Sequence, residues 1–149
     1  MEWDEYFMKQ AELVALKSKD TSTKVGAVLA RHNNGFSTGY NGFPRGVNDN
    51  IPERHERPAK YDWTVHSELN CLLNAAREGF KTYGSTMYVT LHPCKECAKA
   101  IVQAGVKRVV FLTDDNPRFD FVLAKQILNE GHVICEKYGE PYEPMWHPV

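Results

Sequence analysis

The stretch MYVTLHPCKECAKAIV, residues 87–102, decides the fold class of this chain. Its first part alternates apolar and polar residues through Met87, Val89 and Leu91, which is typical of a strand with one buried face. Pro93 suits the first turn of a helix, and an apolar stripe at helical spacing follows it, made of Cys94, Cys97, Ala98, Ile101 and Val102. A strand that runs directly into a helix favours an α/β fold.

The same alternation continues on both sides of this stretch. Helices are expected over residues 3–17, 65–79, 93–105 and 116–130, and strands over residues 25–30, 36–40, 87–91, 108–113 and 132–135. His32-Asn33-Asn34-Gly35 predicts a hairpin turn between the first two strands, because Asn-Gly tolerates positive φ. Residues 41–62 lack periodicity and predict one long loop, of a length that is usually functional.

This order of elements predicts a three-layer α/β/α sandwich built on one mixed five-stranded sheet, with a single domain over residues 1–149. The first two strands should pair as an antiparallel hairpin. The later strands are joined through helices, so they should run parallel with right-handed crossovers. A C-terminal tail rich in proline completes the chain.

Composition and charge exclude several classes of protein. Hydrophobic residues make up 42% and charged residues 25% of the chain, as in an average soluble globular protein. The net charge of −1 argues against a stable nucleic-acid partner, although a local basic cluster could still bind one phosphate. No apolar run approaches the ~20 residues that span a bilayer, and the acidic N-terminus is unlike a signal peptide. We therefore expect a cytoplasmic protein that has no membrane partner.

Two short motifs carry the chemistry: His66-Ser67-Glu68 and Pro93-Cys94-Lys95-Glu96-Cys97, each at the start of an expected helix. Cys94 and Cys97 are three positions apart, so their sulfurs face the same way on the first turn. The helix N-terminus favours thiolate over thiol, which prepares both sulfurs for a soft cation. With His66 they make three zinc ligands and leave a fourth position for water, which is the pattern of a catalytic site.

Glu68 is better placed as the acid and base beside that water than as a fourth ligand, which would close the site. Residues two apart on a helix do not share a face, so His66 and Glu68 can converge only where the helix begins. The combined pattern H-x-E…P-C-x-x-C is the signature of zinc-dependent nucleobase deaminases.

Two other interpretations of the cysteines, as a redox site or as a structural zinc site, remain open. A strand followed by a helix-opening C-x-x-C also describes a thioredoxin-like redox site, but that interpretation leaves His66 and Glu68 unexplained. A closed structural zinc site would need a fourth protein ligand and would not need Glu68. Cys71 and Cys135 fall outside any ligand spacing and are expected to be buried apolar residues.

The chain as a whole resembles the cytidine deaminase-like superfamily and, within it, the deoxycytidylate (dCMP) deaminases. The resemblance runs through Ser22–Val28, Gly39–Gly46, Glu56–Tyr61, Val65–Glu68 and Thr90–Cys94 with Cys97. It implies hydrolytic deamination of dCMP to dUMP and ammonia, which supplies dUMP for dTMP synthesis. One catalytic zinc ion per chain is expected, because the extra cysteines that hold a second zinc in some relatives are missing before Cys71.

The resemblance also assigns residues and partners. It implies that Asn41 contacts the sugar or the base edge of the nucleoside. Lys24 and Arg45 are expected to supply positive charge for the 5′-phosphate, with Arg57 and Lys60 as weaker candidates. It further implies a homohexamer that dCTP activates and dTTP inhibits. Deamination of another free cytosine compound stays open, as does deamination of a base in a polynucleotide, against which the near-neutral charge weighs.

Overall fold

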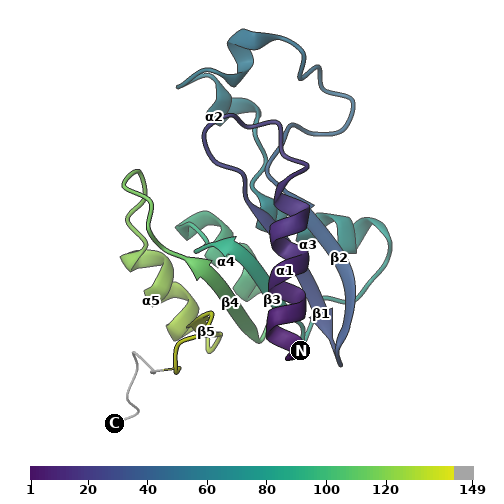
Figure 1. Ribbon diagram of the computed structural model, residues 1–149, viewed down its shortest axis with the longest axis vertical. Coiled ribbons are helices and arrows are strands. Elements are labelled where there is room, and N and C mark those ends of the chain that lie inside the picture. The colour runs from purple at the N-terminus through teal and green to yellow at the C-terminus, as the bar shows by residue number, and fades with distance from the viewer. Residues whose placement is uncertain (143–149) are drawn as a thin grey trace.

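The computed structural model describes residues 1–142, and the expected tail beyond them lies outside the described residues. The elements along the chain are helix α1 (Trp3–Ala15), strands β1 (Gly26–Arg31) and β2 (Asn34–Tyr40), the short 3₁₀ helix η1 (Pro52–His55), helices α2 (Lys60–Trp63) and α3 (Ser67–Arg77), β3 (Thr86–Leu91), α4 (Lys95–Gln103), β4 (Arg108–Thr113), α5 (Val122–Glu130) and β5 (Ile134–Lys137) (Figure 1).

The strands form one five-stranded sheet in the order β2-β1-β3-β4-β5. β1 pairs antiparallel with both β2 and β3, whereas β3–β4 and β4–β5 are parallel. The central strands are buried on both faces. In β3 the polar neighbour Tyr88 packs under α1 while Met87 and Val89 face the other helices, so the single buried face expected from the alternation is wrong. The expected mixed sheet, with its antiparallel hairpin and its later parallel strands, is confirmed.

Helices cover both faces of the sheet, so the three-layer arrangement is also confirmed (Figure 1). α1 covers one face alone and packs Phe7, Met8 and Ala11 against Val28 and Tyr88. On the other face, side chains of α3, α4 and α5 meet the opposite side of the strands in the larger part of the core, which contains Leu29, Cys71, Leu72, Met87, Val89, Ile101, Val109 and Leu128.

The expected boundaries of three elements are wrong. The hairpin turns at His32 and Asn33, which have φ of 53° and 60°, so Asn34 and Gly35 already belong to β2. α5 begins at Val122 and not at residue 116, because Asn116 Oδ1 accepts the N–H of Arg118 in a separate turn. β5 lies at Ile134–Lys137, about two residues later than expected.

The long loop expected at residues 41–62 is an ordered excursion that contains η1 and α2. We call it the insert and define it as residues 43–64, because a backbone bridge between Gly42 and Val65 closes its base. Inside it, the Phe43 ring stacks between His55 and Trp63, with centroid distances of 4.8 and 6.2 Å. This stack gives the insert a small core of its own. Because its three rings are not spaced periodically in the sequence, the sequence pattern does not predict it.

The insert rises from one end of the sheet, and the α1–β1 connection (residues 16–25) reaches up beside it (Figure 1). β3 and β4 also end on this side, and β1 begins there, because it is antiparallel to β3. Loops from several strands therefore meet at one end of the sheet, which is where α/β proteins bind ligands. Within the described part of the chain, none of the helices combines the length and the apolar character needed to cross a membrane.

Close packing of α3 on β2 depends on Gly39. A Cβ atom at this position would lie 2.4 Å from both the Ser67 carbonyl oxygen and the Cys71 backbone nitrogen. We expect Gly39→Ala to lower the free energy of unfolding by about 3 kcal/mol, the upper end of the cost of overpacking a core. Chemical denaturation measures this loss. Gly42→Ala is the matched control, since its Cβ would meet only the Tyr40 ring, at 3.5 Å; equal stability of the two variants would contradict the prediction.

Candidate active site

Two helix N-termini bring the candidate metal ligands together. His66 is the N-cap of α3 and Cys94 is the N-cap of α4, both with extended backbone (ψ 153° and 171°). Neither side chain makes a capping hydrogen bond, so both are free to point toward each other. Cys97 lies in the first turn of α4 and brings its sulfur to the same place. The start of α3 is thus the irregular position at which His66 and Glu68 can both reach one cavity.

The geometry of these three side chains fits zinc. His66 Nδ1 lies 3.4 Å from Cys94 Sγ and 3.5 Å from Cys97 Sγ, and the three ligand atoms all lie within 4.8 Å of one another. A tetrahedral ion with Zn–S of about 2.3 Å and Zn–N of about 2.0 Å requires N···S distances of about 3.5 Å. Among the described residues this is the one group of three or more such side chains close enough to share an ion.

The electrostatics of the cysteines also suit a cation. Hydrogen bonds from the Cys97 thiol and from His66 lower the pKa of Cys94 to about 4. The hydrogen bond between the two cysteines raises the pKa of Cys97, because Cys94 and Cys97 share one proton. The hydrogen bond between His66 and Cys94 raises the pKa of His66. These contacts favour the thiolate form of Cys94, and thiolates are the form that ligates zinc.

Glu68 lies beside these ligands, in the first turn of α3, and is 5% exposed. Burial raises the pKa of its carboxyl group, while a hydrogen bond that Ser67 Oγ donates to Oε1 acts in the opposite direction. Burial thus favours proton uptake by this carboxyl group relative to an exposed glutamate, and a group that accepts and passes on protons suits general acid–base catalysis. Glu68 lies near His66 and is not part of the metal cluster, and its role as acid and base stays a prediction.

A cavity of about 150 Å³ opens from these residues toward the insert. His66, Glu68 and Cys94 form one part of its wall. The rest of the wall comes from the α1–β1 connection, the insert and the loop between β4 and α5, through Asp20, Thr23, Arg57, Lys60, Tyr61, Thr64, Asn116, Arg118, Phe119 and Phe121. One cavity therefore brings the reactive groups together with cationic side chains.

Asn41 lines the cavity, and both ends of its side chain bind backbone. Its Oδ1 accepts the N–H of Val25 at 2.8 Å, and its Nδ2 donates to the Thr23 carbonyl at 2.9 Å. These two bonds fix the start of β1 against the end of β2. Each end of the amide keeps one further hydrogen-bonding position, so a contact with a nucleoside remains compatible with this arrangement.

The two cations expected at the phosphate, Lys24 and Arg45, are not brought to the cavity. Arg45 Nη2 donates a hydrogen bond to Asn74 Oδ1 of α3 at 2.6 Å. Neither Lys24 nor Arg45 lines the cavity wall. The cations that do line it are Arg57, Lys60 and Arg118. Arg118 was not expected; the only available signal is its place just after a strand of the parallel part of the sheet, where ligands commonly bind.

His92 is a second residue that sequence reasoning missed. It is 1% exposed and lies between the rings of Phe111 and Phe121, with centroid distances of 4.7 and 4.9 Å. Its Nδ1 lies 2.8 Å from the Pro93 carbonyl oxygen, and burial lowers its pKa to about 4. A neutral imidazole therefore supports the backbone that leads into Cys94.

Comparisons with known proteins agree with this geometry. A family model described as the cytidine and deoxycytidylate deaminase zinc-binding region matches residues 1–113. The chain belongs to this family. It is an enzyme of the aminohydrolase class with zinc as its cofactor, and the fold expected from the resemblance is confirmed.

Individual relatives extend the match beyond the zinc-binding region. The chain is 41% identical to a human deoxycytidylate deaminase over 145 residues, which covers 93% of this chain and 80% of the relative. It is 36% identical to the deoxycytidylate deaminase of Enterobacteria phage T4, covering 68% and 72%. The crystal structure of dCMP deaminase from cyanophage S-TIM5 in complex with dCMP and dUMP superposes with a TM-score of 0.75 at 29% identity, covering 89% and 94%.

Proposed function

We propose that this deaminase converts dCMP and water to dUMP and ammonia, as part of the supply of dUMP for dTMP synthesis. The observation that carries the proposal is the cavity, whose wall combines zinc ligands and a buried carboxyl group with cationic side chains. The relatives named deoxycytidylate deaminase support the choice of nucleotide.

The side chains present divide the chemistry between them. His66, Cys94 and Cys97 hold zinc, which when bound lowers the pKa of a water molecule toward about 7 and so makes the nucleophile available. Glu68 accepts the proton of the attacking water and delivers it to N3 of the cytosine ring. It then takes the remaining proton from the hydroxyl group added at C4 and passes it to the amine at C4, so that ammonia leaves and the C4 carbonyl forms. Its burial next to His66 keeps the one carboxyl group close to water, ring and amine for these successive transfers.

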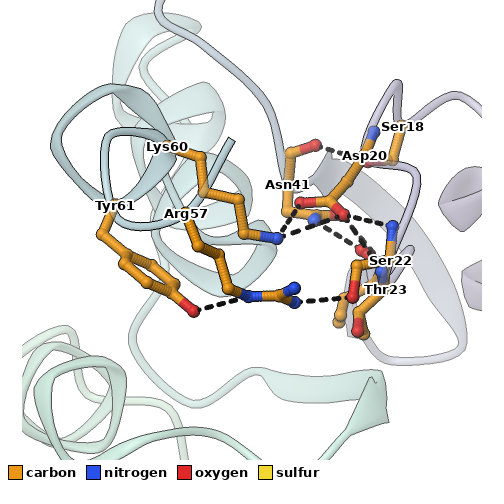
Figure 2. Close-up of polar contacts among 9 residues, drawn as sticks. Ser18, Asp20, Ser22, Thr23, Asn41, Arg57, Lys60 and Tyr61 are labelled. Carbon is orange, nitrogen blue, oxygen red and sulfur yellow. Dashed lines mark hydrogen bonds and ion pairs between the residues drawn. The ribbon is translucent and has the colours of Figure 1, made fainter. Parts of the chain in front are cut away.

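Arg57 and Arg118 are the residues we propose for the 5′-phosphate. Among the described residues no ion pair involves either of them, whereas Lys60 is paired with Asp20. Arg57 is held by two uncharged groups: its Nε donates to Tyr61 Oη at 2.8 Å and its Nη2 to Ser22 Oγ at 2.6 Å (Figure 2). An arginine fixed in a cavity wall by hydroxyl groups keeps its charge for an anion.

Substrate preference tests the proposed function directly. The cytosine ring is common to cytosine, deoxycytidine, dCMP and dCTP, so the zinc site alone cannot distinguish them. If two charge-assisted hydrogen bonds to the phosphate contribute about 1.5–3 kcal/mol each, kcat/KM for dCMP should exceed that for deoxycytidine by ~10²–10⁴-fold. An ammonia-release assay on the four compounds side by side measures this. Equal efficiency on dCMP and deoxycytidine would favour the nucleoside as the natural substrate.

We also propose a homo-oligomer, a hexamer by family resemblance, with dCTP and dTTP as its effectors. The outer face of α3 supports an interface, because Leu69 and Leu73 are 36% and 53% exposed, one helical turn apart. Light scattering at working concentration is expected to show a closed oligomer, and dCTP should change the dependence of rate on dCMP concentration. A monomeric protein would contradict the first expectation, and an unchanged rate profile the second.

A cytoplasmic location remains a prediction, and the state of the thiols agrees with it. All four cysteines are free, and two of them are placed to ligate a metal. Reduced cysteines of this kind fit a compartment in which disulfides are rare.

A further inference from the structure

One wall of the cavity is made by two segments that are far apart in the sequence. Lys60 Nζ, from the insert, lies 3.1 Å from Asp20 Oδ2 in the α1–β1 connection. The contact from Arg57 to Ser22 joins the same two segments, and Figure 2 shows both side chains reaching from the insert across to the connection. A third link, Lys19 to Asp49 at 3.0 Å, also joins them, but neither of its residues lines the cavity.

On the α1–β1 connection, Asp20 holds this part of the cavity wall in place. Its Oδ1 accepts the N–H groups of Ser22 at 2.8 Å and of Thr23 at 3.0 Å, so it fixes the turn that carries both residues. Burial raises the pKa of the carboxyl group, but these two hydrogen bonds and the Lys60 ammonium outweigh it and hold the pKa below its ordinary value. The side chain is 14% exposed, so the ion pair with Lys60 is partly shielded from water.

On the insert, Lys60 forms the other half of the ion pair. Its side chain is 11% exposed, and its ammonium group faces Asp20. It belongs to α2, and Tyr61 follows it directly in that helix. The two hydroxyl groups that hold Arg57 therefore sit next to the ion pair, one on each side: Ser22 in the turn fixed by Asp20, and Tyr61 beside Lys60.

We propose that Asp20 and Lys60 act as one positioning unit for Arg57 and thereby set how strongly the enzyme prefers a 5′-phosphorylated substrate to its nucleoside. Neither residue serves as the phosphate ligand, because each neutralises the other. The proposal rests on the proposed function in one respect, that Arg57 binds the phosphate. It adds that the ion pair determines the separation of the two hydroxyl groups and hence the direction of the guanidinium group.

The test is a double-mutant cycle with Asp20→Asn, Lys60→Met and the double variant. Asn keeps an oxygen for the Ser22 and Thr23 N–H groups, and Met keeps most of the lysine chain, so each change removes chiefly the charge. Each single variant should raise KM for dCMP about tenfold and change kcat less than about twofold. The double variant should be no worse than either single one, because the two charges act as a unit. Efficiency on deoxycytidine should stay unchanged.

Asp49→Asn is the matched control, since it breaks an ion pair between the same two segments away from the cavity, and it should leave KM for dCMP unchanged. Thermal unfolding of every variant separates repositioning from loss of fold. A lower KM in Asp20→Asn together with a higher KM in Lys60→Met would make Lys60 a direct phosphate ligand and overturn the proposal. Additive effects in the double variant, or equal losses on dCMP and deoxycytidine, would overturn it as well.

The unmodified enzyme is assayed first on dCMP and deoxycytidine in the same series. Absence of any preference there overturns the substrate assignment together with the positioning role that depends on it. A clear preference that survives unchanged in all three variants overturns only the positioning role.

Discussion

Glu68→Gln is expected to fold, to bind zinc and to lose nearly all turnover of dCMP. Glutamine has the same shape and can still accept the hydrogen bond from Ser67, so the packing of this buried position is kept. It cannot carry a proton between water, ring and amine. General acid–base catalysis contributes ~10²–10⁴-fold, and because Glu68 handles several transfers in turn, the loss of kcat should reach the upper end of that range or exceed it.

Ammonia release and zinc content, measured on the same preparation, check this expectation. Glu96→Gln is the matched control, since Glu96 is an exposed carboxylate in the first turn of α4, paired with Lys99 at 2.8 Å. It lies one residue from Cys97 but does not line the cavity, and its replacement should leave turnover unchanged. If Glu68→Gln kept a tenth of normal activity, the assignment of Glu68 as the proton carrier would be wrong.

The positions of the zinc ligands and of Glu68 could be foreseen because their signals are local. A histidine before one helix, and a cysteine before another, place their side chains at helix N-termini whatever the rest of the chain does. The mixed sheet, with its antiparallel hairpin and its later parallel strands, could be foreseen for a similar reason, since apolar strands separated by amphipathic helices leave few ways to bury both faces. The one further requirement, that the two helix starts meet, followed from the combined pattern H-x-E…P-C-x-x-C and from the three ligands that a catalytic zinc needs.

Which arginine of the insert lines the cavity could not be decided from the sequence, because it depends on how the insert folds. Arg45 and Arg57 both lie in the insert, and the amino-acid sequence alone does not indicate which of the two lines the cavity. The difference arises from the stack of Phe43, His55 and Trp63 and from the link between Lys60 and Asp20, both of which form only in the folded chain. The start of α5 was misplaced for a related reason, since Asn116 and Asp120 each bind a backbone N–H and only the second one leads into the helix.

Cys97→Ala is expected to lose both zinc and activity. Replacing groups that merely support a ligand weakens metal binding by about 10–100-fold, so removing one of three direct ligands should cost more than that. After dialysis against a chelator, metal analysis should find little zinc in this variant and about one ion per chain in the unmodified enzyme. Activity should fall with metal content, and added zinc should restore the dialysed unmodified enzyme but not the variant.

Cys71→Ala separates loss of a ligand from loss of a buried thiol. Cys71 is fully buried in α3, where burial raises its pKa to about 12, so it stays a neutral thiol and packs as an apolar group. Its replacement creates a small cavity without touching the metal cluster, and zinc content should not change. Full zinc retention in Cys97→Ala, or two tightly held zinc ions per unmodified chain, would contradict the assignment of a single ion to His66, Cys94 and Cys97. Equal zinc loss in both cysteine variants would mean that the metal site responds to destabilisation of the core and not to the missing ligand.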